Sequence, residues 1–283
     1  MFGFLNVYKP KGITSHDVVA VLRRVTGVKQ IGHTGTLDPF AEGVLPVCIG
    51  KATRLIEYLN DEKAYIGTLK LGASTTTYDI EGDVSKTSDK KVTLDEIKDV
   101  LDNFKGEIEQ FPPMYSAIKV NGKKLYEYAR QGEDVEIKPR KVTVNEIKIL
   151  NFDAEKQEIE IYIKCSKGTY IRSIANDLGQ KLGTYAYLIK LIRVQAGDFL
   201  VQNSVQLENL KTLEDVHNNL IHPLDYLNYP KYSINDEEKN RISNGNSIRV
   251  TYPNGIILLT ENAKIAAVAE VQNSVAKCKK VFI

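Results

Sequence analysis

Asp38 and His33 are the first residues of the chain whose types and spacing could do chemistry. They lie in "GHTGTLDPFAEGVLP" (residues 32–46), where glycines and prolines predict a segment too irregular for a plain helix or strand. Because a proline pushes the preceding residue out of the helical region, Pro39 should hold the Asp38 carboxylate in a fixed, non-helical geometry. Such a carboxylate can serve as a nucleophile or a base. The alternative is an Asx turn at Asp38 and an ordinary surface or core histidine at His33.

Three further residues with useful side chains lie where predicted elements begin or end. Tyr65 opens the strand-like "AYIGTLKL" (residues 64–71), and Tyr170 and Arg172 lie where the strand "EIEIYIKC" turns through a glycine into a helix. An aspartate, an arginine and two tyrosines at the ends of sheet elements could therefore converge on one site.

The elements that must position these side chains follow from periodicity and capping signals. One helix is predicted to end at Gly27, and a second to begin after a capping box at Thr93. Further predictions are strands at 4–10, 64–71, 141–150, 158–165 and 186–194, and a helix over 171–182. Because the strands neither alternate strictly with helices nor cluster as a sandwich, the predicted fold class is α+β, a mixed, largely antiparallel sheet with packed helices.

Residues 112–141, "PPMYSAIKVNGKKLYEYARQGEDVEIKPRK", have a different character. Asn121-Gly122 is a hairpin turn signal, and tyrosines alternate with lysines and arginines around it. Cations suit phosphates and aromatic rings suit unpaired bases, so the segment could grip nucleic acid, although a solvated surface hairpin has a similar composition. From about residue 230 the chain reads as one short helix and several short strands, which predicts a small β-rich C-terminal domain.

Composition limits the class of protein without naming its partner. The 283 residues carry 38 Lys and Arg against 36 Asp and Glu, so any polyanion must be met by local patches. Cys48, Cys165 and Cys278 have neither disulfide nor zinc-site spacing, which favours a reducing compartment. With an N-terminus too short and polar for a signal peptide and no apolar run near ~20 residues, we expect a cytoplasmic protein that does not span a membrane.

Four motifs resemble those of the bacterial tRNA pseudouridine synthase B family, which isomerises uridine-55 in the T loop of tRNA. They are "GHTGTLDPFAEGVLPVCIGKATR", "KAYIGTLKLG", "CSKGTYIRSIANDLG" and "LIRVQAGDF". The resemblance runs from Lys9-Pro10 to about residue 200. It implies a catalytic domain at 1–229, a thumb-like RNA-gripping insertion at about 112–141, and an RNA-binding PUA-like domain at 230–283.

The resemblance also assigns roles residue by residue. It implies catalytic roles for Asp38, for the active-site tyrosine Tyr65, and for Arg172, which pairs with the aspartate. It implies substrate-binding roles for Tyr170 and Leu191, which line the uracil pocket, and for His33, which takes the place of the flipped-out nucleotide. One departure is Thr76, where family members often carry an acid, whereas Asp79 keeps the later acid.

The implied reaction needs no cofactor and no metal. The aspartate could act as a nucleophile or as a base at C2′ in a glycal route, and the sequence leaves both open. The expected partner is the T stem-loop of tRNA, bound by a monomer. The alternative function is an RNA-binding or tRNA-folding protein whose main role is independent of catalysis. A nucleotide-phosphate enzyme is disfavoured because neither G-x-G-x-x-G nor G-x-x-x-x-G-K-[ST] occurs.

Overall fold

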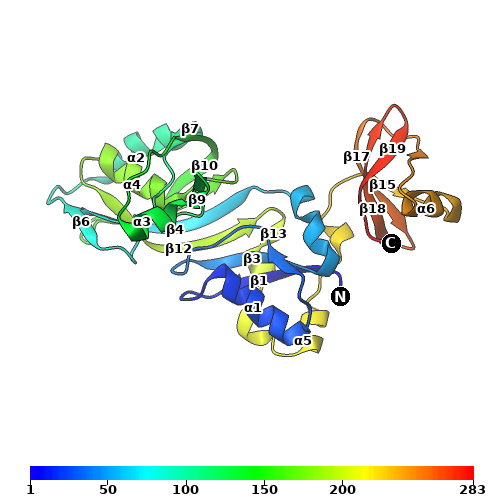
Figure 1. The fold of residues 1–283 in the computed structure, drawn as a ribbon. Coiled ribbons are helices and arrows are strands. Elements are labelled where there is room, and N and C mark those ends of the chain that lie inside the picture. The colour runs from blue at the N-terminus through cyan, green and yellow to red at the C-terminus, as the bar shows by residue number, and fades with distance from the viewer.

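The computed structural model describes residues 1–283, and its largest element is a ten-stranded sheet (Figure 1). The main path of this sheet is β14-β1-β3-β12-β4-β11-β10-β7, with β2 paired to β3 and β13 paired to β12. Only the β1–β14 and β3–β12 pairs are parallel, which confirms the mixed, largely antiparallel sheet. Its strands are β1 (Gly3–Lys9), β2 (Ile31–His33), β3 (Glu42–Ile49), β4 (Lys63–Leu71), β7 (Gly106–Gln110), β10 (Arg140–Asp153), β11 (Glu158–Cys165), β12 (Ala186–Ala196), β13 (Phe199–Leu200) and β14 (Val205–Gln206).

Helices cover the two halves of this sheet separately. Helices α2 (Leu94–Leu101) and α4 (Ile171–Lys181) lie over the half that contains β4, β11 and β10, whereas α1 (Ser15–Thr26) and α5 (Leu213–Asn218) lie at the β1–β3 half (Figure 1). The predicted caps are present: Thr14 caps α1, Gly27 ends it with a φ of 70°, and Thr93 forms the capping box of α2. The structure also contains five 3₁₀ helices, which are η1 (Gly50–Tyr58), η2 (Asp102–Phe104), η3 (Val201–Asn203), η4 (Leu207–Asn209) and η5 (Pro223–Asp225).

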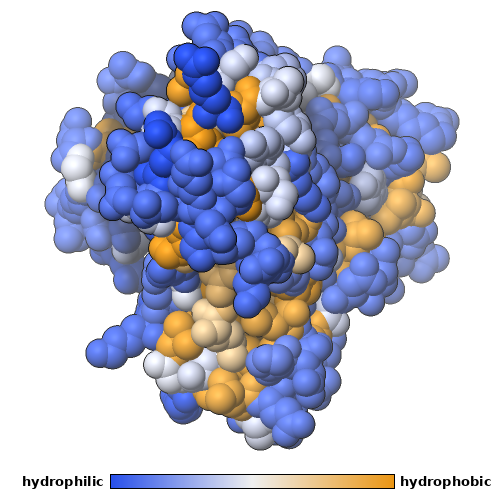
Figure 2. All heavy atoms as spheres, turned by 90° about the vertical axis from the view of Figure 1, so that its right-hand side faces the viewer, coloured by the Kyte–Doolittle hydropathy of each residue, from blue (hydrophilic) through white to orange (hydrophobic).

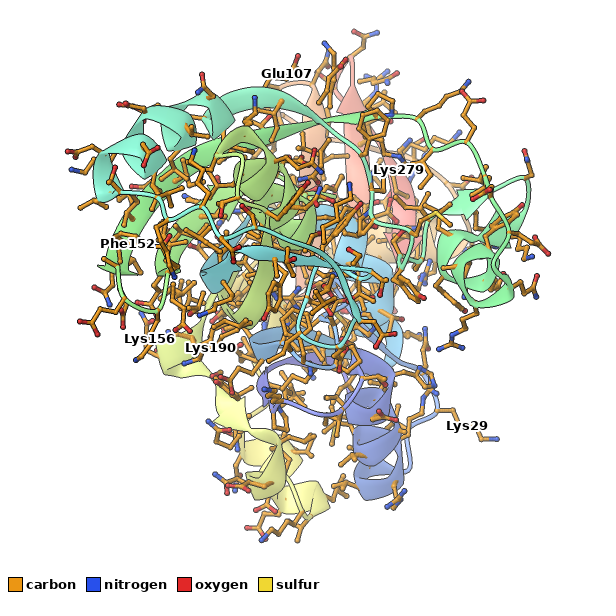
Figure 3. The ribbon with its side chains drawn as sticks, turned by 90° about the vertical axis from the view of Figure 1, so that its left-hand side faces the viewer. Lys29, Glu107, Phe152, Lys156, Lys190 and Lys279 are labelled. Atoms are coloured by element: carbon orange, nitrogen blue, oxygen red, sulfur yellow. The ribbon has the colours of Figure 1, made fainter.

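The period-two pattern of β11 explains the largest apolar cluster. Ile159, Ile161, Ile163 and Cys165 are all buried on one face, where they meet Leu69 of β4 and the apolar side of α4. The opposite face of the strand is partly exposed. Charged side chains such as Lys156 and Lys190 point away from the protein (Figure 3). This half of the sheet thus buries one face under α2 and α4.

The segment at residues 32–46 is more regular than the sequence predicts. Its two ends belong to β2 and β3, which pair antiparallel, so the irregular part covers only residues 34–41. Pro46 fits within β3 because residues 44–46 have a strand partner only on the β1 side. On the other side, the carbonyl of Pro46 accepts a hydrogen bond from the Thr34 amide at 3.1 Å. The expectation that the whole segment is irregular was therefore wrong.

The thumb-like segment contains the predicted hairpin. Strands β8 (Lys119–Val120) and β9 (Lys123–Lys124) flank Asn121-Gly122, both of which have positive φ, and α3 (Leu125–Gln131) follows. The ammonium of Lys123 lies 4.4 Å from the centre of the Tyr128 ring. A second short hairpin, β5 (Ala73–Thr75) with β6 (Val84–Thr87), lies near the same end of the molecule (Figure 1).

A five-stranded sheet and α6 (Asp236–Ser243) form the small β-rich C-terminal domain, which agrees with the PUA-like domain that the resemblance implies (Figure 1). The strands are β15 (Lys231–Ser233), β16 (Ile248–Arg249), β17 (Gly255–Glu261), β18 (Lys264–Gln272) and β19 (Val275–Val281).

The surface on the side of the C-terminal domain is mostly hydrophilic in its upper part, and hydrophobic residues gather in its lower part (Figure 2). None of the helices in the chain is both long and apolar enough to cross a membrane.

The two domains share an apolar cluster. Leu258 and Val268 of the C-terminal sheet are fully buried in a cluster with Phe4, Leu55 and Phe199 of the large domain. The arginine of η1, Arg54, also donates a hydrogen bond to the carbonyl of Val281 at 2.8 Å. The C-terminal domain is therefore packed onto the large domain rather than joined to it only through the connecting chain.

Candidate active site

The loop that carries Asp38 is fixed to helix α1. The Ser15 hydroxyl accepts a hydrogen bond from the Leu37 amide at 2.8 Å and donates one to the Leu37 carbonyl at 3.1 Å. The Asp38 carbonyl accepts from the Ala41 amide at 3.1 Å, which closes a tight turn over Pro39. The Asp38 carboxylate thus leaves a loop that has little freedom to move.

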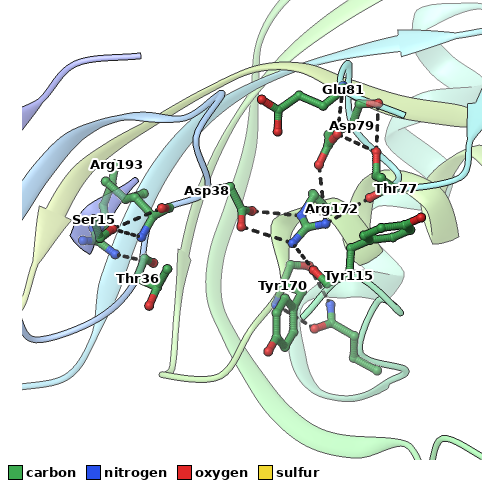
Figure 4. A network of polar contacts seen from close by, with 12 residues as sticks. Ser15, Thr36, Asp38, Thr77, Asp79, Glu81, Tyr115, Tyr170, Arg172 and Arg193 are labelled. Carbon is green, nitrogen blue, oxygen red and sulfur yellow. Dashed lines mark hydrogen bonds and ion pairs between the residues drawn. The ribbon is translucent and has the colours of Figure 1, made fainter. Parts of the chain in front are cut away.

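A buried arginine of β12 fixes the same loop from the other side. Arg193 is fully buried, and its Nη2 and Nε donate to the carbonyls of Gly35 at 3.0 Å and Val44 at 2.7 Å. Its Nη1 lies 3.4 Å from the Thr36 carbonyl (Figure 4). These contacts satisfy carbonyls that no neighbouring strand reaches.

Asp38 pairs with Arg172, as the resemblance implies. The arginine Nε lies 2.9 Å from Oδ2 of Asp38, and Nη2 donates to Oδ1 at 3.2 Å (Figure 4). Two contacts between a planar guanidinium and a carboxylate fix orientation as well as charge. The Arg172 side chain is 5% exposed and that of Asp38 is 34% exposed, so only the carboxylate is available to a ligand.

Arg172 is also bound to three other groups. Its Nη1 lies 3.4 Å from Oδ2 of Asp79 and donates to the Thr77 carbonyl at 3.1 Å, and Nη2 donates to the Tyr115 carbonyl at 2.9 Å (Figure 4). Asp79 is itself buried and accepts from the Thr77 hydroxyl at 2.6 Å. The guanidinium therefore joins the Asp38 loop, the turn after β5 and the thumb-like segment at one point.

The protein environment changes the ionisation of Asp38. Burial raises the pKa of its carboxyl, the positive charge of Arg172 opposes that rise, and the negative charge of Asp79 adds to it. The raised pKa is compatible with a side chain that is one-third exposed, because the surrounding protein atoms displace much of its hydration without closing it off from the cavity. Asp38 is thus a carboxylate of increased basicity, held in a fixed direction.

Most of the site residues predicted from the sequence converge on one cavity of about 470 Å³. Five of the six residues named from the sequence line it: Asp38, Tyr65, Tyr170, Arg172 and Leu191. Its lining also includes Tyr115, which the sequence analysis did not single out for the site. The volume and the mixture of aromatic, aliphatic and charged walls suit a nucleotide-sized ligand.

Tyr65 and Leu191 come from neighbouring strands in the middle of the sheet. Tyr65 lies opposite Arg193 in the β4–β12 register, and Leu191 lies opposite Gly67. Tyr65 is 7% exposed, and burial raises the pKa of its hydroxyl to about 12. The phenol is therefore protonated at neutral pH.

Tyr170 is held where α4 begins. The buried side chain of Gln110 accepts from the Tyr170 amide at 2.7 Å and donates to its carbonyl at 3.0 Å. This double contact places Tyr170 at the cavity wall, two residues before Arg172.

His33 is not part of the cavity lining. It lies in β2 opposite Val47, and its Nδ1 is buried without a hydrogen-bond partner. Burial lowers the pKa of the imidazole, so the ring is neutral at physiological pH. The prediction that His33 meets the flipped nucleotide stays a prediction.

The sequence analysis missed the buried cations around the Asp38 loop. Lys9 and Arg193 are both fully buried, and the Lys9 ammonium donates to the carbonyls of Pro10 at 2.9 Å and Ile13 at 2.7 Å. Burial lowers the pKa of Lys9 to about 8. A charged residue at the end of an apolar strand, as in "FLNVYK" or "LIRV", is the signal that could have identified them.

A second cavity, of about 700 Å³, lies at the junction of the two domains, among Met1, Phe2, Lys51 and Phe282. It is larger than the Asp38 cavity but contains no aimed carboxylate, and its Glu261 is paired with Lys239 at 2.8 Å. The chemistry therefore favours the smaller cavity. No group of three or more His, Cys, Asp or Glu side chains is arranged to hold a metal ion.

Comparisons with known proteins place the chain in a family. The chain matches the model of the TruB family pseudouridylate synthase N-terminal domain over residues 23–171, and that of the tRNA pseudouridylate synthase B C-terminal domain over residues 172–227. Asp38, Tyr65 and Asp79 fall in the first match, and Arg172 and Leu191 in the second. Residues 228–283 lie beyond both matches.

Relatives of similar length extend the comparison to almost the whole chain. The chain is 44% identical to tRNA pseudouridine synthase B of Caldanaerobacter subterraneus, over 92% of this chain and 91% of the relative. It is 45% identical to that of Staphylococcus aureus, over 99% of each. A chain in the solved structure of an H/ACA RNP bound to a substrate RNA containing 2′-deoxyuridine has the same fold, with a TM-score of 0.74 and 23% identity over 100% of this chain and 85% of that one. The chain belongs to the TruB family of pseudouridylate synthases.

Proposed function

We propose that this protein converts uridine to pseudouridine at position 55 in the T loop of tRNA, with Asp38 as the catalytic carboxylate. The observation that carries the proposal is the ion pair of Asp38 with Arg172, at 2.9 Å, inside a cavity shared with Tyr65 and Leu191. The names of the relatives supply the substrate class, and the resemblance of the motifs supplies the position.

The reaction is an isomerisation that consumes no cosubstrate. The N1–C1′ bond breaks, the uracil turns over, and C5 joins C1′; the proton on C5 leaves and N1 gains one. Asp38 either attacks as a nucleophile, through a bond that breaks again before the product leaves, or removes a proton at C2′ and returns it when C5 joins C1′. Both roles require its ionised form. Arg172 keeps that carboxylate directed into the cavity.

The other cavity residues act on the base. The ring of Tyr65 offers a stacking surface for uracil, and its protonated hydroxyl can take part in the transfer of the C5 proton. Leu191 and Tyr170 close the walls, which keeps a detached uracil from escaping. These side chains project from strands of the sheet or from the start of a helix. Such rigid elements suit a site that must not release its intermediate.

The uridine must leave the RNA stack to reach this cavity, at a cost of a few kcal/mol. In the proposal, His33 stacks in the vacated space and the thumb-like segment at about 112–141 closes over the loop. The domain boundary near residue 229, the RNA-binding role of residues 230–283, action as a monomer and a cytoplasmic location belong to the same proposal.

The test is incubation of a T stem-loop RNA, tritiated at C5 of its uridines, with the purified protein. Tritium release and chemical mapping should report one pseudouridine, at position 55, with or without EDTA. Asp38→Asn should release none, and Asp89→Asn, which alters an exposed aspartate, should match the natural protein. An Asp38→Asn protein with full activity would contradict the catalytic assignment. A natural protein that binds the RNA without modifying it would favour the alternative role in RNA folding.

A further inference from the structure

A lysine in the wall of the catalytic cavity has no carboxylate partner. Lys63 begins β4, two residues before Tyr65, and so projects to the same face of the strand. Its ammonium makes one long contact, 3.4 Å, to the carbonyl of Asp61. The carboxylate of Asp61 is instead paired with Lys167 at 2.7 Å. Lys63 thus brings a charge into the cavity that the protein itself does not neutralise.

A second cation lies behind it. A Cβ atom added at Gly35 would lie 3.2 Å from Cε of Lys63 and 3.8 Å from Nη1 of Arg193, so both side chains meet at this glycine. Arg193 contacts three carbonyl groups and the Tyr65 hydroxyl, and no carboxylate forms an ion pair with it. Burial and the charge of Arg193 both lower the pKa of Lys63. Two partly or fully buried cations without an acid between them form a region of positive potential.

The nearby carboxylates are directed at another group. Asp38 and Asp79 both contact Arg172, and neither of them forms an ion pair with Lys63. Buried cations normally have an anionic partner, so the missing partner should come from the ligand. In an RNA the permanent anions are the backbone phosphates, and one of them must follow the flipped uridine toward the cavity.

We propose that Lys63 binds a backbone phosphate next to the flipped uridine and that Arg193, from behind, strengthens the positive potential at this subsite. The proposal rests on the proposed function, since it takes a uridine of tRNA as the ligand. Because Lys63 is half-buried at the cavity wall, it can reach a phosphate that stays outside while the base enters. The phosphate contact sets the depth to which the nucleotide enters and so places C1′ near Asp38.

The experiment measures the affinity of Lys63→Gln for the T stem-loop as a function of salt, in an Asp38→Asn background that prevents turnover. Loss of one phosphate contact should weaken binding about tenfold at low salt and reduce the slope of log Kd against log salt by about 0.7 to 0.9. Lys63→Arg should recover most of the affinity. Lys70→Gln is the matched control: this lysine lies on the same strand, is paired with Glu158 at 3.4 Å, and should bind normally.

A neutral methylphosphonate in place of one phosphate identifies the group that is bound. Two RNAs are compared, one with this change on the 5′ side of the uridine and one with it on the 3′ side. One of them should bind about tenfold more weakly than the unmodified RNA to the protein that has Lys63, whereas Lys63→Gln should bind that RNA and the unmodified RNA equally well. Equal losses for both proteins on both RNAs would overturn the proposal. A second result would also overturn it: Lys63→Gln binds the RNA with normal affinity, but the same variant with Asp38 intact reacts more slowly at saturating RNA. Affinity is read without turnover, so failure of this subsite and failure of the proposed function are distinguishable.

Discussion

Arg172→Lys tests whether the fixed direction of Asp38 matters as much as its charge. The arginine makes five polar contacts, two to Asp38 and one each to Asp79, Thr77 and Tyr115. A lysine has three N–H donors on one atom, so at least two of these five acceptors lose their partner. Since each unpaired buried group costs about 1–3 kcal/mol, we expect the free energy of unfolding to fall by about 2–6 kcal/mol where the two are buried ones.

The catalytic effect should be larger than the loss of stability suggests. A displacement of a reacting group by about 1 Å can slow a reaction about 10²-fold, and a lysine cannot hold both oxygens of Asp38 in plane. The assay is single-turnover tritium release at saturating RNA, under conditions where urea unfolding curves show that the variant is folded. Arg24→Lys, on the exposed surface of α1, controls for the exchange of residue type. A folded Arg172→Lys protein within about threefold of the natural rate would refute the reasoning.

Three other predictions concern the carboxylate, the histidine and the C-terminal domain. The single-turnover rate should fall with decreasing pH as Asp38 protonates. Because Asp79 raises the pKa of Asp38, Asp79→Asn should move this fall to lower pH. A fall that stays at the same pH or moves to higher pH would count against the assignment. His33→Ala should slow the reaction on intact tRNA by about 10- to 100-fold, and less on a short unstructured RNA; equal losses on both would indicate a role other than base flipping. A protein of residues 1–229 should have a lower Tm, because it exposes the apolar cluster that contains Phe199. It should also bind tRNA more weakly but keep its rate at saturating RNA. A collapse of that rate would place catalytic groups in the removed domain.

Much of the site could be predicted because its residues lie in recognisable local patterns. The fold class followed from strand periodicity and helix caps, and the site from motifs that resemble a family. The partners of Arg172 could not be predicted, because the carbonyls of Thr77 and Tyr115 carry no signal in the sequence and meet only in the folded chain. Arg193 went unrecognised for a related reason: its acceptors are backbone carbonyls of a distant loop.

The limits of β2 and β3 were missed for a physical reason. The glycines and prolines of residues 32–46 predict irregular backbone when only neighbouring residues are considered. In the sheet, the Thr34 amide and the Arg193 side chain bond to carbonyls of β3 that face no strand. Tertiary contacts thus extend strands into a segment that local propensity disfavours.

The central place of β12 in the sheet has a consequence for synthesis on the ribosome. β12 lies between β3 and β4, although more than a hundred residues separate it from both in the chain. Until residue 196 has emerged, the nascent chain can form only two separate pieces, one with the Asp38 loop and one with Tyr65, and each has an unpaired strand edge. Insertion of β12 joins them and brings in Leu191 and Arg193 at the same moment. The enzyme should therefore gain activity in one late step of its synthesis, and chains stalled before that step should be inactive and prone to aggregate through those edges.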